Sequence, residues 1–245
     1  MKQAMIFAAG LGTRLKPLTD TMPKALVSVG GDPLLKHVII KLKNAGFERV
    51  VVNVHHFAQQ IIDYLAANNN FGLDIRISDE SEMLLETGGG IKKAIPLFDA
   101  DSPVLIHNVD ILSNVDLSAF YDLSSNNNAT LLVSERKTKR YLLFDEQMNL
   151  KGWTNVETGE VKSPYVPLDV EPLQRLAFSG IHVISPFMFP CFDEMPQRFS
   201  IIDFYLKFCC NYPLRGYRKT DLRLMDVGKT DTLKEAEQFL QTLSI

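Results

Sequence analysis

The chain has 245 residues, of which 46% are hydrophobic and 22% charged, and its formal net charge is -3. That length is enough to bury a large core, and a slightly acidic balance without a basic tail argues against a nucleic-acid-binding protein. The 3 cysteines lack metal-ligand spacing, and their odd number argues against a disulfide framework and suits a reducing compartment. The apolar runs are too short for a signal peptide or a membrane span, so we expect a cytoplasmic protein without membrane contact.

The first half of the chain predicts alternating strands and helices. Apolar, β-branched runs predict strands over 4–9, 49–56, 73–80 and 102–112. Apolar residues at helical spacing predict helices over 33–46, 57–70, 89–98 and 116–128. This alternation is typical of an α/β fold, so we expect a doubly wound, Rossmann-like mixed sheet that is mainly parallel, with helices on both faces.

The second half, from residue 129, has a different pattern. Strands with hairpin-type links are predicted within 129–137, 141–155 and 176–185, and two short strands within 214–228. Helices are predicted over 199–211 and 231–243. The segment 157–175 has three prolines and no clear period, which favours a functional or mobile loop. Neither a repeat nor a linker separates the halves, so we expect a single domain, 1–245, built from the halves 1–128 and 129–245.

The stretch "AAGLGTRLKPLTDTMPKAL", from Ala8 to Leu26, places two glycines directly after the first strand. Glycines there let backbone N–H groups approach a phosphate closely. A Walker A loop would need Gly-Lys-Ser/Thr, which is absent. A dinucleotide-binding loop would need a third glycine at Leu15 and an acidic residue after the second strand, which ends "VNVHH" instead. Neither a P-loop NTPase nor a dehydrogenase is therefore expected.

The loop has the order Gly-x-Gly-Thr-Arg, a spacer and Pro-Lys, and it resembles the signature of the sugar-1-phosphate nucleotidyltransferases. Four later blocks match that family in order: "LETGGGI", "LIHNVDIL", "FSGIHVISP" and "MDVGKTDTLKEAE". The chain is most similar to the short bacterial members, the N-acetylmuramate-1-phosphate uridylyltransferases and the mannose- or heptose-1-phosphate guanylyltransferases. The resemblance implies Mg²⁺-dependent nucleotidyl transfer from UTP or GTP to a sugar 1-phosphate, with release of pyrophosphate.

The resemblance also implies the roles of the two halves and of the loop. Residues 1–128 would bind the nucleotide, and residues 129–245 would form a small sugar-binding β lobe and close the fold. Arg14 would neutralise the leaving pyrophosphate, and Lys24 would bridge the α-phosphate and the sugar phosphate. The nucleotide would contact Ala8, Ala9, Gly10, Leu11, Gly12, Thr13, Glu86, Gly88, Gly89 and Asn108.

Two carboxylates are the expected metal ligands. Asp110 ends an apolar strand, at the sheet edge where ligands bind in such folds, and the resemblance adds Asp226 from "MDVG". Two carboxylates with phosphate oxygens and water suit Mg²⁺. For the sugar, the resemblance points to Ser179 and Gly180. Asn53, at a strand end, is a further candidate for the sugar or ribose, or a cap for the helix that follows. An alternative is a non-catalytic nucleotide-sugar sensor of the same fold, but such a protein need not retain all four charged residues.

The sequence departs from the family in two places. Val109 stands before Asp110 where the family usually has glycine, which puts contacts to the base or ribose in question. The family's Glu-x-Lys-Pro stretch is also missing, so its sugar-phosphate lysine has no clear counterpart. The candidate substitutes are Lys137, Lys139, Arg140 and Arg175. We expect Trp153 and His107 to be core residues and assign no role to His55 or His56.

Overall fold

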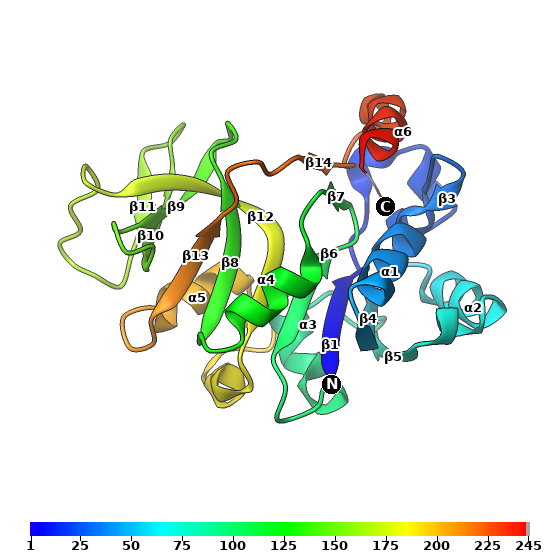
Figure 1. Ribbon diagram of the computed structural model, residues 1–245, viewed down its shortest axis with the longest axis horizontal. Helices are drawn as coiled ribbons and strands as arrows, with labels where there is room; N and C mark the ends of the chain where they lie inside the picture. Colours follow the sequence, from blue (N-terminus) through cyan, green and yellow to red (C-terminus); the bar gives the residue numbers. More distant parts are fainter. Residues whose placement is uncertain (244–245) are drawn as a thin grey trace.

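The computed structural model describes residues 1–243, and a ten-stranded sheet runs through it (Figure 1). Four parallel neighbours form one side of the sheet, in the order β6 (Val104–Asn108), β1 (Lys2–Phe7), β4 (Phe47–Val54) and β5 (Asp74–Asp79). The helices that connect them are α1 (Leu34–Asn44), α2 (Ala58–Ala67) and α3 (Glu86–Ala94). All four carboxyl ends therefore lie at one edge of the sheet, which is where parallel α/β folds bind ligands.

The other side of the sheet contains both parallel and antiparallel strand pairs, and it extends into the β lobe formed by the second half of the chain. The long strand β12 (Gln174–Ile184) pairs antiparallel with β6 through residues 181–184 and with β9 (Arg140–Phe144) through residues 174–176. Next to β9 follow β10 (Leu150–Asn155) and β11 (Glu160–Lys162). Off this path, β8 (Ala129–Ser134) pairs with β12, and β13 (Leu214–Arg218) pairs parallel with β8. The lobe is thus a continuation of the central sheet, joined through β12.

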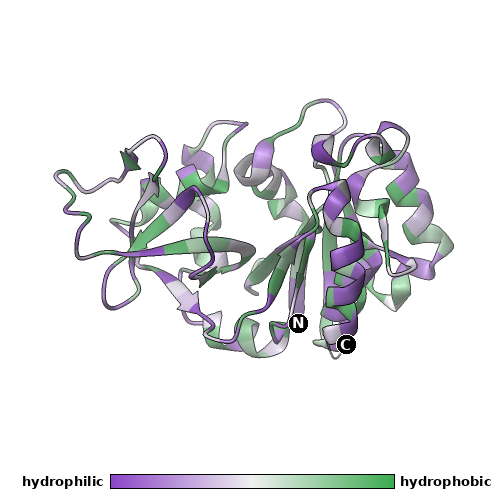
Figure 2. Ribbon diagram, turned by 90° about the horizontal axis from the view of Figure 1, so that it is seen from above, coloured by the Kyte–Doolittle hydropathy of each residue, from purple (hydrophilic) through white to green (hydrophobic). Residues whose placement is uncertain are grey.

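Helices cover both faces of the sheet, and each face has its own core. On β1, the side chains of Ala4 and Ile6 join one core and that of Met5 joins the other, as the period of a strand requires. The first core contains residues of α1, α2, α4 (Leu117–Ser124) and α6 (Leu233–Thr242). The second contains residues of α3, α5 (Ile201–Phe208) and the 3-10 helix Pro186–Glu194. Figure 2 shows hydrophobic residues on the central strands and hydrophilic ones on the outer surfaces of the helices.

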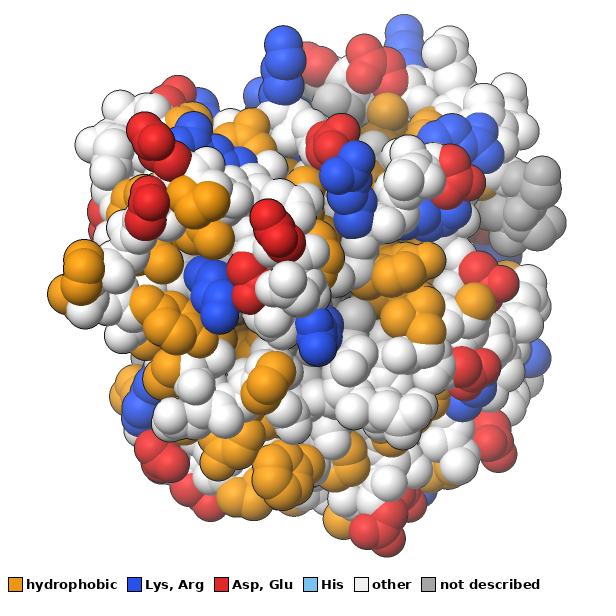
Figure 3. All heavy atoms as spheres, turned by 60° about the vertical axis from the view of Figure 1, so that its left-hand side comes forward, with side chains coloured by type: hydrophobic (Ala, Val, Ile, Leu, Met, Phe, Trp, Pro, Cys, Tyr) orange, Lys and Arg blue, Asp and Glu red, His pale blue; other side chains and the backbone are white. Residues whose placement is uncertain are grey.

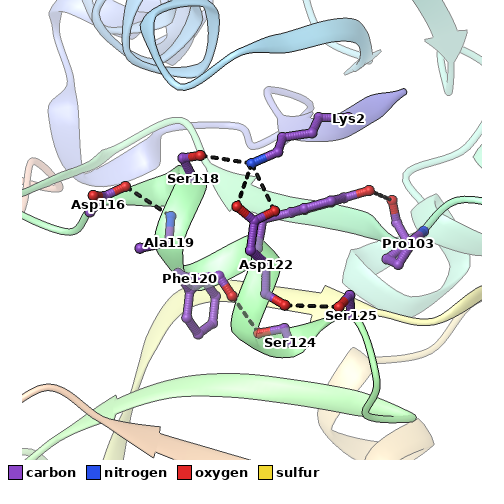
Figure 4. A network of polar contacts seen from close by, with 10 residues as sticks. Lys2, Pro103, Asp116, Ser118, Ala119, Phe120, Asp122, Ser124 and Ser125 are labelled. Atoms are coloured by element: carbon purple, nitrogen blue, oxygen red, sulfur yellow. Dashed lines mark hydrogen bonds and ion pairs between the residues drawn. The ribbon is translucent and has the colours of Figure 1, made fainter.

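The helix α4 is attached to β1 by a polar network (Figure 4). The ammonium group of Lys2 donates to Ser118 Oγ at 2.7 Å and pairs with the carboxylate of Asp122 at 2.8 Å. Asp116 begins the helix, because its carboxylate accepts from the backbone N–H of Ala119 at 2.9 Å. Together these contacts fix α4, which follows β7 (Ile111–Ser113), against the start of β1.

We expect Asp116→Ala to lower the free energy of unfolding by about 1 kcal/mol, because the first turn of α4 loses its cap. Urea denaturation measures this change, and Asp116→Asn, which can still accept the hydrogen bond, is the matched control. An Asp116→Ala variant as stable as the Asn variant would contradict this role of the cap.

The predicted helices and most predicted strands are present, with small differences at their ends. The prediction of one strand over 102–112 was wrong, because this stretch divides into β6 and β7, which pair in different sheets. Hairpin pairing is found for β9 with β10, whereas β8 pairs with β12 and β13. The exception in type is the stretch 186–194, which forms a 3-10 helix that the sequence did not reveal. Two short strands, β2 (Ser28–Val29) and β3 (Asp32–Pro33), were also missed. The segment 157–175 contributes β11 and the start of β12, and its middle is open to solvent, with Val166 89% exposed.

Figure 3 shows the molecule with the β lobe turned forward, and charged side chains of both signs lie among separate groups of hydrophobic ones. A continuous basic track, as nucleic-acid binding requires, is not seen on this face. In the part of the chain that the structure describes, no helix is both long and apolar enough to cross a membrane.

Candidate active site

The glycine loop after β1 folds back onto the segment that carries Lys24. Gly12 has φ +63°, and a Cβ atom at that position would lie 2.9 Å from Thr19 Cγ2 and 3.0 Å from Lys24 Cβ. The hydroxyl of Thr19 donates to Gly12 O at 2.9 Å and holds this turn. Glycine is therefore required at position 12 both for backbone conformation and for space. The loop residues Gly10, Leu11, Thr13 and Arg14 are exposed and available to a ligand.

Lys24 and Asp110 meet at the carboxyl edge of the sheet. Lys24 begins a 3-10 helix (Lys24–Leu26) and is only 9% exposed. Its ammonium group forms an ion pair with Asp110 Oδ2, although 86 residues separate the two in sequence. The pairing of β1 with β6 explains this ion pair. Asp110 follows the carboxyl end of β6, and that end lies beside the start of the glycine loop that follows β1.

Asp226 is brought to the same place by a short antiparallel ribbon. The strand β14 (Leu224–Asp226) pairs with β7 (Ile111–Ser113), Asp226 is opposite Ile111, and Val227 N donates to Asp110 O at 2.9 Å. Loss of hydration and the nearby charge of Asp110 raise the pKa of Asp226, whereas Lys24 and Arg14 act in the opposite direction. The raised pKa means that a further cation beside the two carboxylates would be stabilising.

These two carboxylates fit a hard divalent cation. Both offer oxygen ligands, their mutual repulsion favours a bound cation, and Mg²⁺ takes one or two carboxylates together with phosphate oxygens and water. Among the described residues, no group of three or more acidic, histidine or cysteine side chains is arranged to hold a metal ion. The remaining ligands of a magnesium ion here would therefore come from substrate phosphates and water.

Gly228 lies between Asp226 and Arg14. A Cβ atom on Gly228 would lie 2.7 Å from Arg14 Nη2 and 2.8 Å from Asp226 Oδ1. The guanidinium group of Arg14 and the carboxylate of Asp226 therefore occupy the space that a side chain at position 228 would need. This contact explains the glycine of the "MDVG" block.

We expect Gly228→Ala to lower kcat/KM for the nucleotide at least about tenfold, because the methyl group displaces Arg14 and Asp226 from their positions. Steady-state pyrophosphate release, measured over a range of Mg²⁺ concentrations, tests this, with thermal melting as the control for folding. A variant with unchanged kcat/KM would mean that Arg14 and Asp226 do not need their present arrangement.

A cavity of about 250 Å³ opens beside Lys24 and Asp110, between the carboxyl ends of the parallel strands and the start of α3. Eight predicted site residues line it: Ala8, Ala9, Gly10, Lys24, Asn53, Glu86, Asn108 and Asp110. Five further lining residues were not predicted: Phe7, Glu80, Leu84, Thr87 and Val109. Glu80 could have been found by the reasoning applied to Asp110, because it directly follows β5 at the same edge of the sheet.

Gly88 and Gly89 do not line this cavity. Their backbone N–H groups donate to Phe199 O at 2.9 and 3.2 Å. A Cβ atom on Gly88 would overlap the ring of Phe199, and one on Gly89 would overlap Gln197 O. The structure therefore gives these glycines a packing role beneath the segment 197–199, and their contact with the nucleotide stays a prediction.

Glu86 begins α3 in an unusual conformation at the wall of the cavity. Its φ is +63°, which is costly for a residue with a Cβ atom. Its carboxylate pairs with Arg198 Nε at 2.9 Å, and both side chains are largely exposed. A strained residue beside a cavity is a recognised mark of a ligand site.

Of the predicted sugar contacts, Asn53 bonds to the backbone and Ser179 is buried. The amide of Asn53 accepts from Ala8 N at 2.7 Å. Ser179 has no exposed surface and, within residues 1–243, no partner for its hydroxyl. Gly180, at φ +72°, lies where a Cβ atom would be 2.7 Å from Asn108 Nδ2, so its glycine leaves room for Asn108 in the cavity.

The two departures from the family also have structural positions. Val109 is not among the residues with positive φ; it is buried, and its N–H donates to Phe7 O at 3.2 Å, so valine is accommodated without strain. The candidate phosphate-binding cations Lys137, Lys139, Arg140 and Arg175 do not line the cavity. Lys139 pairs with Glu157 at 2.9 Å on the surface. Trp153 is partly buried against the second core, as expected.

A larger cavity, of about 590 Å³, lies beneath α1, β7, α4 and α6 and contains none of the predicted site residues. Lys41 and His107 line it. Burial lowers the pKa of Lys41 to about 8, and burial followed by the charge of Lys41 lowers the pKa of His107 to about 4. His107 is therefore neutral near pH 7 and buried as predicted. Of the four charged residues predicted for the chemistry, Lys24 and Asp110 line the smaller cavity, whereas Arg14 and Asp226 line neither of the two cavities.

Known proteins similar to this chain are nucleotidyltransferases. The family model described as nucleotidyl transferase matches residues 3–142. A relative, the N-acetylmuramate alpha-1-phosphate uridylyltransferase of Neisseria meningitidis, is 35% identical over 96% of both chains. The mannose-1-phosphate guanyltransferase of Yarrowia lipolytica is 26% identical over 99% of this chain and 65% of its own length.

The fold is also found in solved structures. HddC from Yersinia pseudotuberculosis, solved with GMP-PN, superposes with a TM-score of 0.76 at 22% identity, over 98% of this chain and all of its own. At that identity the likeness concerns the fold alone. The family-model match, the full-length relative and the gathering of Lys24, Asp110 and Asp226 beside a glycine loop lead to one conclusion: the chain belongs to the nucleotidyl transferase family and is a sugar-1-phosphate nucleotidyltransferase.

Proposed function

We propose that the enzyme transfers a uridylyl group from UTP to N-acetylmuramate 1-phosphate and uses Mg²⁺. The choice of substrates is supported by the full-length relative from Neisseria meningitidis, which carries that name. The observation that carries the chemistry is the cluster of two cations and two carboxylates, Arg14, Lys24, Asp110 and Asp226, behind a glycine loop.

The reaction forms one bond and breaks one. An oxygen of the sugar phosphate attacks the α-phosphorus of UTP, the bond from that phosphorus to the β-phosphate oxygen breaks, and pyrophosphate leaves with the electron pair. Because the attacking phosphate is already an anion near pH 7, no side chain has to remove a proton. The enzyme must mainly align two anionic substrates and neutralise charge, which suits lysine, arginine and a divalent cation.

Each group in the cluster has a place in this scheme. The exposed N–H groups of the glycine loop and Arg14 bind the β- and γ-phosphates. Lys24, largely buried beside Asp110, stabilises charge where the sugar phosphate meets the α-phosphorus. Asp110 and Asp226 would hold Mg²⁺, which when bound neutralises the phosphate oxygens.

The sugar side requires a cation that the sequence did not identify. Arg136 donates from Nη2 to Phe178 O at 3.0 Å. This hydrogen bond holds the exposed guanidinium of Arg136 next to the turn that contains Gly180. Gly180 lies against Asn108, which lines the cavity. We therefore add Arg136, which like Lys137, Lys139, Arg140 and Arg175 does not line the cavity, to the candidates for the sugar-phosphate contact.

The test is pyrophosphate release with Mg²⁺ over a grid of four nucleoside triphosphates against glucose, mannose, N-acetylglucosamine, N-acetylmuramate and heptose 1-phosphates. We expect release with UTP and N-acetylmuramate 1-phosphate. Release with GTP and mannose or heptose 1-phosphate would replace this substrate pair, in line with the guanyltransferase relative. Tight nucleotide binding without release in any pair would favour a nucleotide-sugar sensor.

A further inference from the structure

We propose that Glu80 is a positioning residue for the nucleotide, which through Asn53 and Leu85 holds the two walls of the cavity at a fixed spacing. The proposal deepens the function given above and rests on it. Glu80 was not among the residues that the sequence indicated. Its proposed role follows from its two side-chain hydrogen-bond partners, Asn53 and Leu85.

Glu80 is a fully buried carboxylate without a cationic partner among the described residues. It follows β5, its exposed fraction is 0%, and its backbone N–H donates to Val54 O at 2.7 Å. Each carboxylate oxygen has one donor: Asn53 Nδ2 lies 2.7 Å from Oε1, and Leu85 N lies 3.1 Å from Oε2. Burial raises the pKa of Glu80, and both hydrogen bonds oppose that rise. A buried carboxylate is costly unless its oxygens accept hydrogen bonds. The positions of Asn53 and Leu85, which supply those bonds, are therefore tied to Glu80.

The first partner, Asn53, connects Glu80 to the wall that begins the glycine loop. Asn53 Oδ1 accepts from Ala8 N at 2.7 Å and from Ala9 N at 3.3 Å. These two alanines line the cavity immediately before Gly10. A displacement of Asn53 would therefore move the backbone that presents the phosphate-binding loop.

The second partner, Leu85, connects Glu80 to the opposite wall. Leu85 is the residue before α3, and the next residue, Glu86, lines the cavity with its φ at +63°. By accepting from Leu85 N, Glu80 stabilises the turn that holds Glu86 in this conformation. One carboxylate thus spans the strand-side wall and the helix-side wall.

The third glycine of "TGGG" is explained by the same network. A Cβ atom on Gly90 would lie 2.8 Å from Glu80 Oε1 and 3.2 Å from Asn53 Nδ2. Gly90 is buried and does not line the cavity, so its missing side chain leaves room for the hydrogen bond between Glu80 and Asn53 rather than for a ligand.

The direction of these hydrogen bonds is fixed by the backbone. Ala8, Ala9 and Leu85 present N–H donors, so Asn53 must turn its oxygen to the alanines and its NH₂ to Glu80. Residue 80 must then accept on both sides, which a carboxylate does. Glutamine at position 80 leaves two donors facing each other whichever way its amide turns. Aspartate at position 53 together with glutamine at position 80 restores every bond, because the glutamine NH₂ then donates to the new carboxylate and the glutamine oxygen accepts from Leu85 N.

The experiment compares four proteins: the wild type, Glu80→Gln, Asn53→Asp and the double variant. We expect each single substitution to displace the walls, so that UTP binds only after they return at the cost of one unsatisfied buried hydrogen-bonding group. The Kd for UTP with Mg²⁺, measured by calorimetry, and the KM for UTP should therefore rise about tenfold. For Glu80→Gln, the KM for the sugar phosphate should stay within about twofold, because Glu80 forms its side-chain hydrogen bonds with Asn53 and Leu85 and none with Arg136 or Gly180. The double variant should return both UTP values to within about threefold of the wild type.

Several outcomes would overturn the proposal. A folded double variant that binds UTP as weakly as the single variants would mean that Glu80 contacts the nucleotide directly or serves no positioning role. Equal loss of affinity for both substrates, in proportion to a lower melting temperature, would indicate a purely structural role. If the single variants fail to fold, the double variant alone decides by its Kd for UTP. UTP binding needs no transfer, so silence of the wild type in the substrate grid would contradict the proposed function and leave this comparison intact.

Discussion

Asp110→Asn is expected to lower kcat about a thousandfold, because the substitution removes one of the two carboxylates that would hold the metal beside the transferred phosphate. The amide is nearly the same size as the carboxylate, so the fold should persist. Asparagine also cannot pair with Lys24 as an anion, which leaves that ammonium group without its counter-charge. The measurement is pyrophosphate release at saturating Mg²⁺, with the melting temperature recorded for each protein.

The matched control for this change is Asp101→Asn, the same substitution at an exposed carboxylate outside the cavity. It should leave kcat unchanged. If Asp110→Asn retained kcat within about tenfold of the wild type and the same dependence on Mg²⁺, Asp110 would not be a metal ligand. An inactive protein with a much lower melting temperature would instead show that Asp110 is needed for folding.

The architecture could be predicted because its causes are local in the sequence. A strand that is buried on both faces needs apolar side chains throughout, which explains the run around Met5 and Ile6. A glycine with positive φ commonly ends a helix, and Gly46, at φ +82°, follows α1 in this way. The 3-10 helix at 186–194 was missed because Pro186 and Pro190 obscure any helical period. Its stability comes from Met188 and Phe192 in the second core rather than from local propensity.

The glycine loop and Lys24, which we propose to bind phosphates, could be singled out for the same reason, since one short segment carries them. What the sequence did not show depends on contacts between distant segments. Asn53 interacts with Glu80, 27 residues away, and Gly88 is covered by Phe199 from the other half of the chain. A glycine that serves packing and a glycine that serves a ligand look alike in a sequence. Only the atoms that a Cβ would meet distinguish Gly88 from Gly12.

Lys24→Met is expected to affect two quantities in opposite directions. Turnover should fall at least about a hundredfold, since the charge that we propose to act beside the reacting phosphates is lost while most of the length of the side chain is kept. Use of the sugar phosphate should suffer more than binding of UTP, because the glycine loop and Arg14 still hold the β- and γ-phosphates.

Binding of Mg²⁺ to the free enzyme should become tighter by about threefold to tenfold, because Lys24 no longer neutralises Asp110 and the pair with Asp226 becomes more negative. Calorimetric titration with Mg²⁺, without substrates, measures this. Lys16→Met is the matched control: Lys16 is exposed in the same segment and pairs with Asp20 at 3.0 Å, so neither turnover nor metal affinity should change. Weaker Mg²⁺ binding in Lys24→Met would mean that Lys24 supports the metal site instead of competing with it. An equal loss for UTP and sugar phosphate would contradict the role of Lys24 between the two substrates.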